Sequence, residues 1–281
     1  MAVEDIAGKW AVVTGAASGM GKTTALELAR QGTNLILVDI CSEPLEEAAR
    51  DCGRLGVSTE QFCVDLTSWE EVQELASTVF SAHGPVDILV NCVGIAHMAY
   101  ILNTSIEEWQ RLIGVNLWTI IYMVKAFAPA MIERGSGHIV NISSGQAFFA
   151  VPTWGAYAAT KFAVDGYTEA LYYELAGRGV HVACVYPGVV RTPFYENIKG
   201  GKLTDLGMRL VMGTVAVKPE AMSRLIVKGI RGRKPKIMQW FVWPVYILRH
   251  VMPWPFEVAG LIGARLLRSE HGSGSSPEDG S

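Results

Sequence analysis

The sequence lacks an excess of charge of either sign. Its 24 lysines and arginines nearly balance 27 aspartates and glutamates, the formal net charge is −3, and no long basic run occurs. Proteins that bind nucleic acid normally have a basic surface patch, so we expect no nucleic-acid partner. Low-complexity sequence is confined to the last ten residues, GSGSSPEDGS, and we expect a disordered tail over residues 271–281.

Cysteine is scarce, and its spacing fits neither a disulfide framework nor a zinc site. Cys41, Cys52, Cys63, Cys92 and Cys184 form an odd set without a CxxC pair, so we expect buried, reduced thiols and no metal. The first ten residues, MAVEDIAGKW, lack the basic start and the sustained apolar run of a secretory signal. These two features favour a cytoplasmic location.

Uninterrupted hydrophobic runs long enough to cross a membrane are also missing. The most aromatic stretch, residues 239–267, is interrupted by Arg249, His250 and Pro253, whereas a membrane span needs about twenty apolar residues. Its tryptophans and flanking arginines are typical of segments that lie on a membrane surface. We therefore expect either peripheral membrane contact through this segment or packing of it on the protein's own substrate loop or on a neighbouring subunit.

Apolar residues are abundant, and they alternate with helix-like segments. Hydrophobic residues make up 50% of the chain and charged residues 18%, which indicates a large core. We predict strands at 10–14, 34–39, 59–64, 87–92, 138–143 and 180–186, and helices at 23–30, 43–50, from 68 onward, 106–133 and 157–176. Strands that are apolar on both faces and alternate with helices predict an α/β fold with a doubly wound (Rossmann) parallel sheet. We expect a single such domain over residues 1–236, with a hydrophobic C-terminal extension over residues 237–270.

The stretch TGAASGMGKTT, at residues 14–24, lies between the first predicted strand and the first predicted helix. Backbone N–H groups at such a turn, together with the positive end of the helix, bind phosphate groups. Its last part, Gly21-Lys22-Thr23, matches the end of a P-loop, but Ala16 stands where a P-loop has its first glycine. A P-loop NTPase is therefore the weaker interpretation.

Asp39 ends the second predicted strand about twenty residues after the glycine turn. A carboxylate there accepts hydrogen bonds from an adenosine ribose and repels a 2'-phosphate. Its neighbours Ala17, Ser18, Ile40 and Cys41 supply no basic side chain that would neutralise such a phosphate. The sequence thus favours NAD(H) over NADP(H); the alternative is that Asp39 only begins a turn.

Further motifs follow one another along the chain. They are Thr14-Gly15-x-x-x-Gly19-x-Gly21, Asp65 in VDL, Asn91-Cys92-Val93-Gly94, Asn116 in GVNLW, NISSG, Tyr157-x-x-x-Lys161 and Pro187-Gly188-x-x-x-Thr192. In this order and spacing, they resemble the classical short-chain dehydrogenase/reductase family over about residues 6–230. Cys92 and Val93 replace the asparagine and alanine of the family pattern, whereas Gly94 is kept.

This resemblance implies a set of cofactor-binding residues and an oligomer. Family members commonly form dimers or tetramers through the helices that match residues 106–133 and 157–176. The residues implied to bind NAD are Gly15, Ser18, Gly19, Met20, Gly21, Asp39, Asp65, Leu66, Asn91, Gly94, Tyr157, Lys161, Pro187, Gly188, Val190 and Thr192.

Tyr157 and Lys161 are four residues apart, so they share one face of a helix and point into one cleft. A phenol has a pKa of about 10, but a nearby ammonium and a cationic nicotinamide favour its ionised form, which makes Tyr157 usable as general base and acid. By resemblance, Lys161 also holds the nicotinamide ribose and Ser144 holds the substrate oxygen, while Ser143 faces the cofactor. Asn116 is implied to interrupt its helix and keep a water in the proton relay.

The segments that enclose the substrate in this family are apolar and aromatic here. They predict a bulky hydrophobic secondary alcohol or ketone, such as a steroid, a terpenoid or a lipid. Filling of the core is the alternative for Phe148 and Phe149. The residues expected to line the substrate pocket are Gln146, Phe148, Phe149, His97, Phe194 and Tyr195, with Gln146 and His97 as polar anchors.

The competing function class is a dinucleotide-binding regulator or scaffold without turnover. Such a protein would not need Asn116, Ser144, Tyr157 and Lys161, all of which are present. The intact set favours an NAD-dependent alcohol dehydrogenase or ketoreductase.

Overall fold

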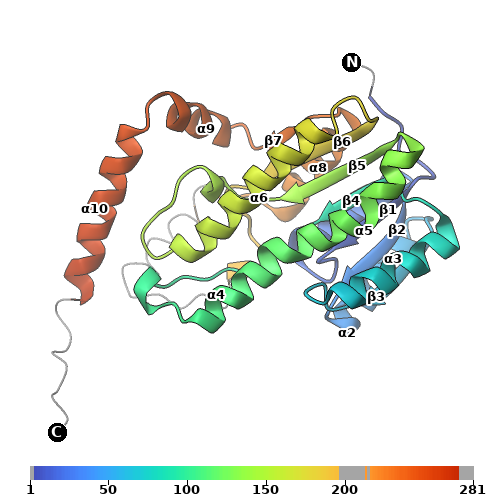
Figure 1. The fold of residues 1–281 in the computed structure, drawn as a ribbon, viewed down its shortest axis with the longest axis horizontal. Helices are drawn as coiled ribbons and strands as arrows, with labels where there is room; N and C mark the ends of the chain where they lie inside the picture. The colour runs from blue at the N-terminus through green and yellow to red at the C-terminus, as the bar shows by residue number, and fades with distance from the viewer. Residues whose placement is uncertain (1–2, 196–212, 214–215, 272–281) are drawn as a thin grey trace, which may run out of the picture.

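A computed structural model describes residues 3–195, 213 and 216–271 of the chain (Figure 1). Seven parallel strands form one sheet in the order β3-β2-β1-β4-β5-β6-β7. The order reverses between β1 and β4, and open α/β sheets bind ligands at the carboxyl ends of the strands beside such a point. The strands are β1 (Trp10–Thr14), β2 (Asn34–Asp39), β3 (Thr59–Cys63), β4 (Ile88–Asn91), β5 (Gly137–Ile142), β6 (Val180–Tyr186) and β7 (Lys236–Met238).

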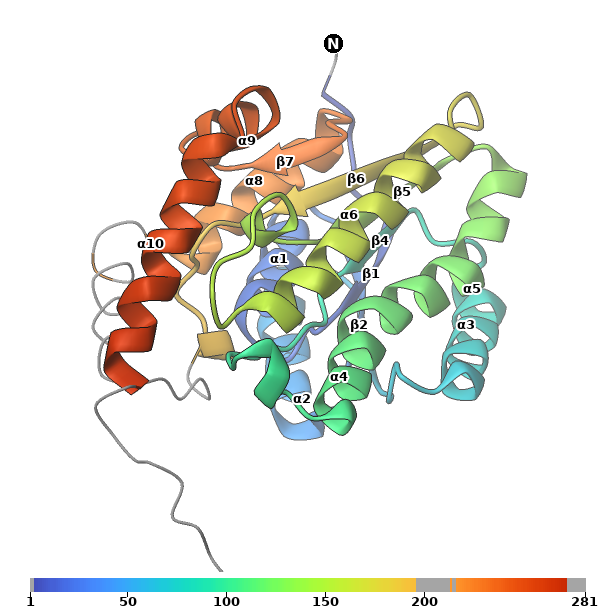
Figure 2. The same ribbon diagram turned by 60° about the vertical axis from the view of Figure 1, so that its left-hand side comes forward.

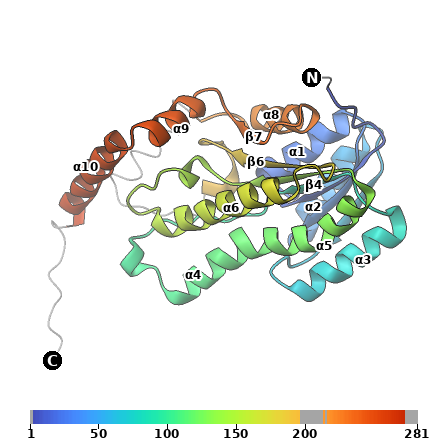
Figure 3. The same cartoon turned by 45° about the horizontal axis from the view of Figure 1, so that its top comes forward.

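Helices cover both faces of this sheet. Figure 3 shows α1, α2 and α8 on one face and α3, α5 and α6 on the other. The helices are α1 (Gly19–Arg30), α2 (Ser42–Gly53), α3 (Trp69–His83), α4 (Ile106–Ile113), α5 (Thr119–Arg134), α6 (Gly155–Glu174), α8 (Pro219–Arg231), α9 (Val242–Val251) and α10 (Trp254–His271). The predicted doubly wound architecture is therefore confirmed.

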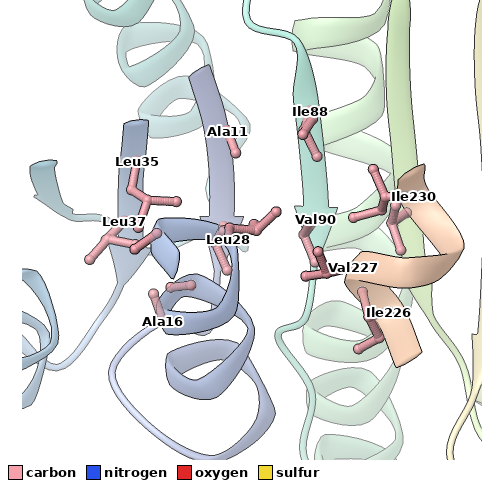
Figure 4. Packing of buried hydrophobic residues seen from close by; sticks show 14 of the residues in the cluster. Ala11, Ala16, Leu28, Leu35, Leu37, Ile88, Val90, Ile226, Val227 and Ile230 are labelled. Atoms are coloured by element: carbon pink, nitrogen blue, oxygen red, sulfur yellow. The ribbon is translucent and has the colours of Figure 1, made fainter. Parts of the chain in front are cut away.

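Among the described residues, the two larger of three buried clusters lie one on each face of the sheet. Along β1, Ala11 and Val13 belong to the first cluster and Val12 to the second, because successive side chains of a strand point to opposite faces. Figure 4 shows the first cluster, in which Leu28 of α1 and Ile226 of α8 lie against the strands. Packing on both faces explains why the strands read as continuous apolar runs.

The sheet extends past the predicted end of the domain. Val185 of β6 pairs with Ile237 of β7, so the boundary placed at residue 236 falls inside a strand and the sheet ends at Met238. Helix α8 and strand β7 were not predicted, and α1 begins at Gly19 rather than at Thr23. The bounds of β1, β2 and β6 match the prediction.

The cysteines differ partly from expectation. All five are free thiols, and Cys52 and Cys184 are buried as predicted. Cys41 and Cys63, however, are exposed. Cys41 follows the end of β2 just before α2, and Cys63 ends β3, the edge strand of the sheet.

One stretch among the described residues, Ile106–Arg134, is long and apolar enough to cross a membrane by length and composition. However, 44% of an apolar 18-residue part of this stretch is buried inside the protein. Met123, Phe127 and Met131 pack on the sheet, which makes it a helix of the protein core.

The C-terminal extension consists of α9 and α10. Figure 2 shows α9 next to β7 and α10 running from it along the side of the molecule. Val242 at the start of α9 is buried in a third cluster with Phe148 and Tyr186, so the extension is joined to the core. The predicted tail over residues 271–281 lies outside the described residues except for His271, which ends α10.

Candidate active site

A cavity of about 640 Å³ lies at the carboxyl ends of the central strands, where the strand order reverses. It brings most of the predicted cofactor residues together. Its lining includes Gly15, Ser18, Gly19, Met20, Gly21, Asp39, Asp65, Leu66, Gly94, Tyr157, Lys161, Pro187, Gly188, Val190 and Thr192.

Asn91, which is predicted to bind the cofactor, is not among the residues that line this cavity. Its side chain is buried and donates a hydrogen bond to Asn141 Oδ1 at 2.8 Å. Asn141 in turn donates to Thr168 Oγ1 at 3.0 Å. Because Asn91 and Asn141 are paired in register on β4 and β5, this side chain ties two strands and α6 together instead of reaching the cavity.

The glycine turn requires glycine for steric reasons. Gly15 and Gly19 have φ values of +65° and +54°, in the left-handed region that L side chains rarely adopt. A Cβ atom on Gly21 would lie 1.9 Å from the carbonyl oxygen of Gly15. The turn thus presses α1 against the end of β1 and leaves the N–H groups of the first helical turn beside the cavity, an arrangement that fits a pyrophosphate.

The side chains that resemble a P-loop point elsewhere. Lys22 Nζ forms ion pairs with Glu47 at 2.8 Å and with Asp51 at 3.1 Å on α2. Thr23 Oγ1 lies 2.7 Å from Ser223 Oγ of α8. Neither side chain lines the cavity, so neither is placed to bind a triphosphate or its magnesium ion.

Asp39 connects the end of β2 to the glycine turn. One carboxylate oxygen accepts a hydrogen bond from the N–H of Ala17 at 3.0 Å, and the other accepts one from the N–H of Cys41 at 3.1 Å. Each oxygen retains a second lone pair that can accept a ribose hydroxyl. Among the described residues that line the cavity, only Lys161 and Arg111 are basic, and neither adjoins Asp39 in the chain.

Asn116 lies in a π-helical turn, Gly114–Trp118, that joins α4 to α5. Such turns are rare and occur frequently at functional sites. The Asn116 side chain is fully buried, accepts the N–H of Ile95 at 2.8 Å, and donates to the carbonyl oxygen of Ile95 and to Thr160 Oγ1, both at 3.0 Å. It therefore links the segment after β4 to α6, next to Lys161.

Lys161 and Tyr157 lie on the same side of α6. Lys161 Nζ donates a hydrogen bond to the carbonyl oxygen of Ile142 at 3.0 Å and lies 5.7 Å from the centre of the Tyr157 ring. Burial lowers the pKa of Lys161 to about 8. The Tyr157 ring packs against Trp154 and Phe194, with ring centres 5.6 and 5.8 Å away.

The two serines after β5 have different surroundings. Ser143 donates its hydroxyl to the carbonyl oxygen of Lys161 at 2.9 Å, which fixes α6 against β5. Ser144 accepts the N–H of Gln146 at 3.1 Å and begins a short 3-10 turn. Both serines line the cavity with Tyr157 and Lys161, so the predicted catalytic side chains Ser144, Tyr157 and Lys161 meet at one place.

Fewer of the predicted substrate residues reach the cavity. Phe194 lines it, beside Tyr157. His97 does not: its Nε2 lies 3.2 Å from Thr104 Oγ1, and its Nδ1 lies 3.9 Å from a Glu108 carboxylate oxygen. Tyr195 ends a 3-10 turn, Pro193–Tyr195.

The aromatic pair after Ser144 packs away from the cavity. Phe148 is 5% exposed and belongs to the third buried cluster, with ring contacts to Tyr186 and Tyr246, so it fills core rather than lining the cavity. The Phe149 ring lies 5.8 Å from that of Phe256 on α10. Gln146 also lies outside the lining, and its buried amide oxygen has no hydrogen-bond partner among the described residues.

Some residues at the site were not predicted. Gln110, Arg111 and Val115 line the cavity from α4 and the π-helical turn. Arg111 and Val115 are four residues apart and therefore share a helix face, a spacing that is visible in the sequence. Trp154 has no such signal, because its contact with Tyr157 depends on the turn that begins α6.

A family model described as short chain dehydrogenase matches residues 9–202. The chain belongs to the short-chain dehydrogenase family. One relative, 3-oxoacyl-[acyl-carrier-protein] reductase FabG of Thermotoga maritima, is 33% identical over 220 residues, which cover 78% of this chain and 89% of the relative. Another, estradiol 17-beta-dehydrogenase 11 of Mus musculus, is 35% identical over 237 residues, covering 83% of this chain and 76% of the relative.

Solved structures of this family have the same fold. A short chain dehydrogenase/reductase from Burkholderia phymatum in complex with NAD has a TM-score of 0.81 at 26% identity, covering 88% of this chain and 94% of that one. The L-sorbose reductase from Gluconobacter frateurii, complexed with NADPH and L-sorbose, has a TM-score of 0.75 at 25% identity, covering 84% and 97%. The short-chain dehydrogenase is thus an oxidoreductase with a Rossmann fold, and its glycine turn and Asp39 fit a nicotinamide dinucleotide.

Proposed function

We propose that this protein is an NAD(H)-dependent oxidoreductase that interconverts a bulky hydrophobic secondary alcohol, of the steroid, terpenoid or lipid kind, and its ketone. The observation that carries this proposal is the meeting of Ser144, Tyr157 and Lys161 in one cavity with the glycine turn. A regulator without turnover would not need this constellation.

The chemistry assigned to these residues is the movement of one proton. When bound, the nicotinamide dinucleotide would accept or supply the hydride. During oxidation, the Tyr157 oxygen takes the proton of the alcohol, whose oxygen Ser144 holds; during reduction, Tyr157 returns the proton. The Lys161 ammonium favours the ionised phenol, and its bond to Ile142 keeps it in place. Asn116 acts as a positioning residue for the relay to Lys161.

The choice of NAD(H) is supported by the surroundings of Asp39. Its carboxylate lines the cavity, and the residues beside it, Ala17, Ser18, Ile40 and Cys41, are not basic. A 2'-phosphate at this place would meet a negative charge without an adjacent counter-charge. We therefore expect NAD⁺ to be used in preference to NADP⁺.

The hydrophobic substrate is supported by the apolar surroundings of Tyr157. Val93, Ile95 and Phe194 line the cavity, and Trp154 packs against the Tyr157 ring. A relative named estradiol 17-beta-dehydrogenase 11 agrees with such a substrate. The test is NADH formation with a panel of hydrophobic secondary alcohols and short sugars or hydroxy acids. If none of the alcohols is oxidised while NADH binds tightly, the alternative of a dinucleotide-binding regulator without turnover is favoured.

We also propose that the protein is cytoplasmic and associates peripherally with membranes through residues 239–267. It further forms a homo-oligomer through the helical segments over residues 106–133 and 157–176. Trp240, Trp243 and Trp254 are exposed, and tryptophan favours the membrane interface. Trp118 and Phe162 are exposed on the helices that pair in the family. Sedimentation with anionic vesicles tests the first contact, and light scattering gives the mass of the oligomer.

A further inference from the structure

A second cavity lies outside the cofactor cavity, between α10 and two loops. It has a volume of about 1120 Å³ and is lined by residues 100–103, 150–153 and 155 and by three residues of α10. We call it the α10 groove. Its apolar lining residues are Ile101, Leu102, Ala150, Val151, Pro152 and Leu261.

The side chains of the α10 groove are poorly covered by the rest of the protein. Leu102 is 96% exposed, Leu261 62% and Ile101 56%. Scattered apolar residues are common on protein surfaces, but apolar residues gathered in a concavity mark a place that an apolar ligand or partner covers.

The walls of the groove are held in place at both ends. Near the start of α10, the Phe256 ring contacts Phe149, and Arg249 donates a hydrogen bond to the carbonyl oxygen of Phe148 at 3.1 Å. Further along α10, a Cβ atom on Gly263 would lie 3.9 Å from Pro152, so the helix approaches the loop closely there. Between these contacts, a Cβ on Gly260 would meet no atom within 4 Å.

The α10 groove reaches the start of α6, the helix that carries the proposed catalytic tyrosine. Gly155 lines the groove and is the first residue of α6, and Tyr157 follows two residues later, on another face of the helix. Trp154, which stands between the groove residues Thr153 and Gly155 in the chain, packs on the Tyr157 ring. Figures 1 and 3 show α10 at the end of the molecule where α6 begins.

We propose that the α10 groove binds the hydrocarbon chain of the substrate while the carbinol carbon lies at Tyr157. This inference rests on the proposed function and narrows its substrate class to secondary alcohols and ketones with a long aliphatic chain. A peptide would need a partner for each of its backbone groups, and beside Glu257 the described lining has polar side chains only at Tyr100, Asn103 and Thr153. Glu257 is the only carboxylate among the described residues of the lining, and it disfavours a chain that ends in an anion.

The test compares 2-alkanols of increasing length, from 2-hexanol to 2-tetradecanol, with NAD⁺. Each methylene that enters the groove raises kcat/KM about fourfold in the natural protein. Gly260→Leu fills the open space, and we expect the ratio of kcat/KM for 2-tetradecanol over 2-hexanol to fall at least about tenfold. Leucine is a better helix former than glycine, so the variant keeps its fold. The matched control is Ala259→Leu, an exposed position of α10 outside the lining, which keeps the ratio.

A binding measurement separates this inference from the proposed function. A long-chain 2-ketone with a terminal diazirine is photolysed on the protein with NADH, and the labelled peptides are identified by mass spectrometry. We expect label on residues 100–103, 150–155 and 257–261. Turnover that does not depend on chain length, or label outside these residues, overturns the inference. Label in the groove without turnover of any alkanol supports the groove and refutes the proposed function.

Discussion

The side-chain nitrogen of Lys161 lies 5.7 Å from the centre of the Tyr157 ring, and the two side chains are only 3% and 6% exposed. This proximity places a positive charge where it favours the ionised phenol. Burial also lowers the pKa of Lys161 to about 8, so the protein keeps this charge at a cost in free energy of folding. The arrangement serves proton transfer rather than stability.

Removing the Lys161 charge should therefore stabilise the free protein. Lys161→Met removes a buried ammonium, and we expect the free energy of unfolding to rise by about 1–2 kcal/mol. This gain is smaller than the full cost of burying the ammonium, because the Ile142 carbonyl loses its hydrogen-bond partner. Below pH 8 the folded and unfolded proteins both carry the charge, so the gain is largest there. As the pH rises from 8 to 10.5, the folded protein loses its proton first and the gain shrinks. Urea unfolding of both proteins over this pH range measures the difference in their free energies of unfolding. A variant that is less stable than the natural protein below pH 8 would contradict the argument.

Tyr157→Phe removes the hydroxyl, the only group of this side chain that can give or take a proton. We expect kcat to fall by about 10³-fold, the range of general acid and base catalysis, while the dissociation constant of NADH changes little. Steady-state kinetics and NADH fluorescence measure the two effects. Tyr172→Phe, on an exposed part of the same helix, is the control. Turnover that survives in Tyr157→Phe would assign the proton to another group.

Asp39→Ala tests the cofactor preference. Without the carboxylate, a 2'-phosphate no longer meets a negative charge and the ribose loses an acceptor, so the ratio of kcat/KM for NAD⁺ over NADP⁺ should fall at least about tenfold. The exposed Asp5→Asn is a control for the loss of one negative charge. A ratio that stays unchanged would show that Asp39 only links the end of β2 to the glycine turn.

Acid should weaken the fold through Glu4. Although burial raises the pKa of Glu4, hydrogen bonds from Lys9, Arg233 and His138 lower it to about 2. A carboxyl whose pKa is lowered in the folded protein contributes stability above its ordinary pKa of 4.5, and this contribution is lost as the pH falls toward 2. Glu4→Gln should be less stable than the natural protein at neutral pH, and the difference should shrink as the pH falls below 4.5. Chemical denaturation of both proteins at successive pH values measures this difference in stability. A difference that does not depend on pH would contradict the lowered pKa of Glu4.

The cofactor side of the molecule could be predicted from the sequence, because local signals define it. The strands have buried apolar runs, and the conformation of the glycine turn depends on Gly15, Gly19 and Gly21 themselves. Asp39 is the last residue of β2, so its position could be predicted with the end of that strand. Strand β7 could not be predicted, since three residues carry no periodicity and it forms only by pairing with β6.

The substrate side was harder to predict, because its side chains are oriented by distant parts of the chain. Phe148 follows Ser144 closely in sequence, yet its ring packs against Tyr186 and Tyr246, from β6 and α9. Asn91 was expected at the cofactor, but its partner Asn141 lies on the neighbouring strand. Such directions depend on tertiary pairing, which a local motif does not contain.

The most direct test of the proposed activity follows the hydride itself. A hydrophobic secondary alcohol carrying deuterium at its carbinol carbon is incubated with the protein and NAD⁺ or NADP⁺, and the reduced dinucleotide is analysed by mass spectrometry. We expect deuterated NADH from the natural protein, much less deuterated NADPH, and almost none of either from Tyr157→Phe. Tight binding of NADH without deuterium transfer from any such alcohol would contradict the proposed oxidoreductase function.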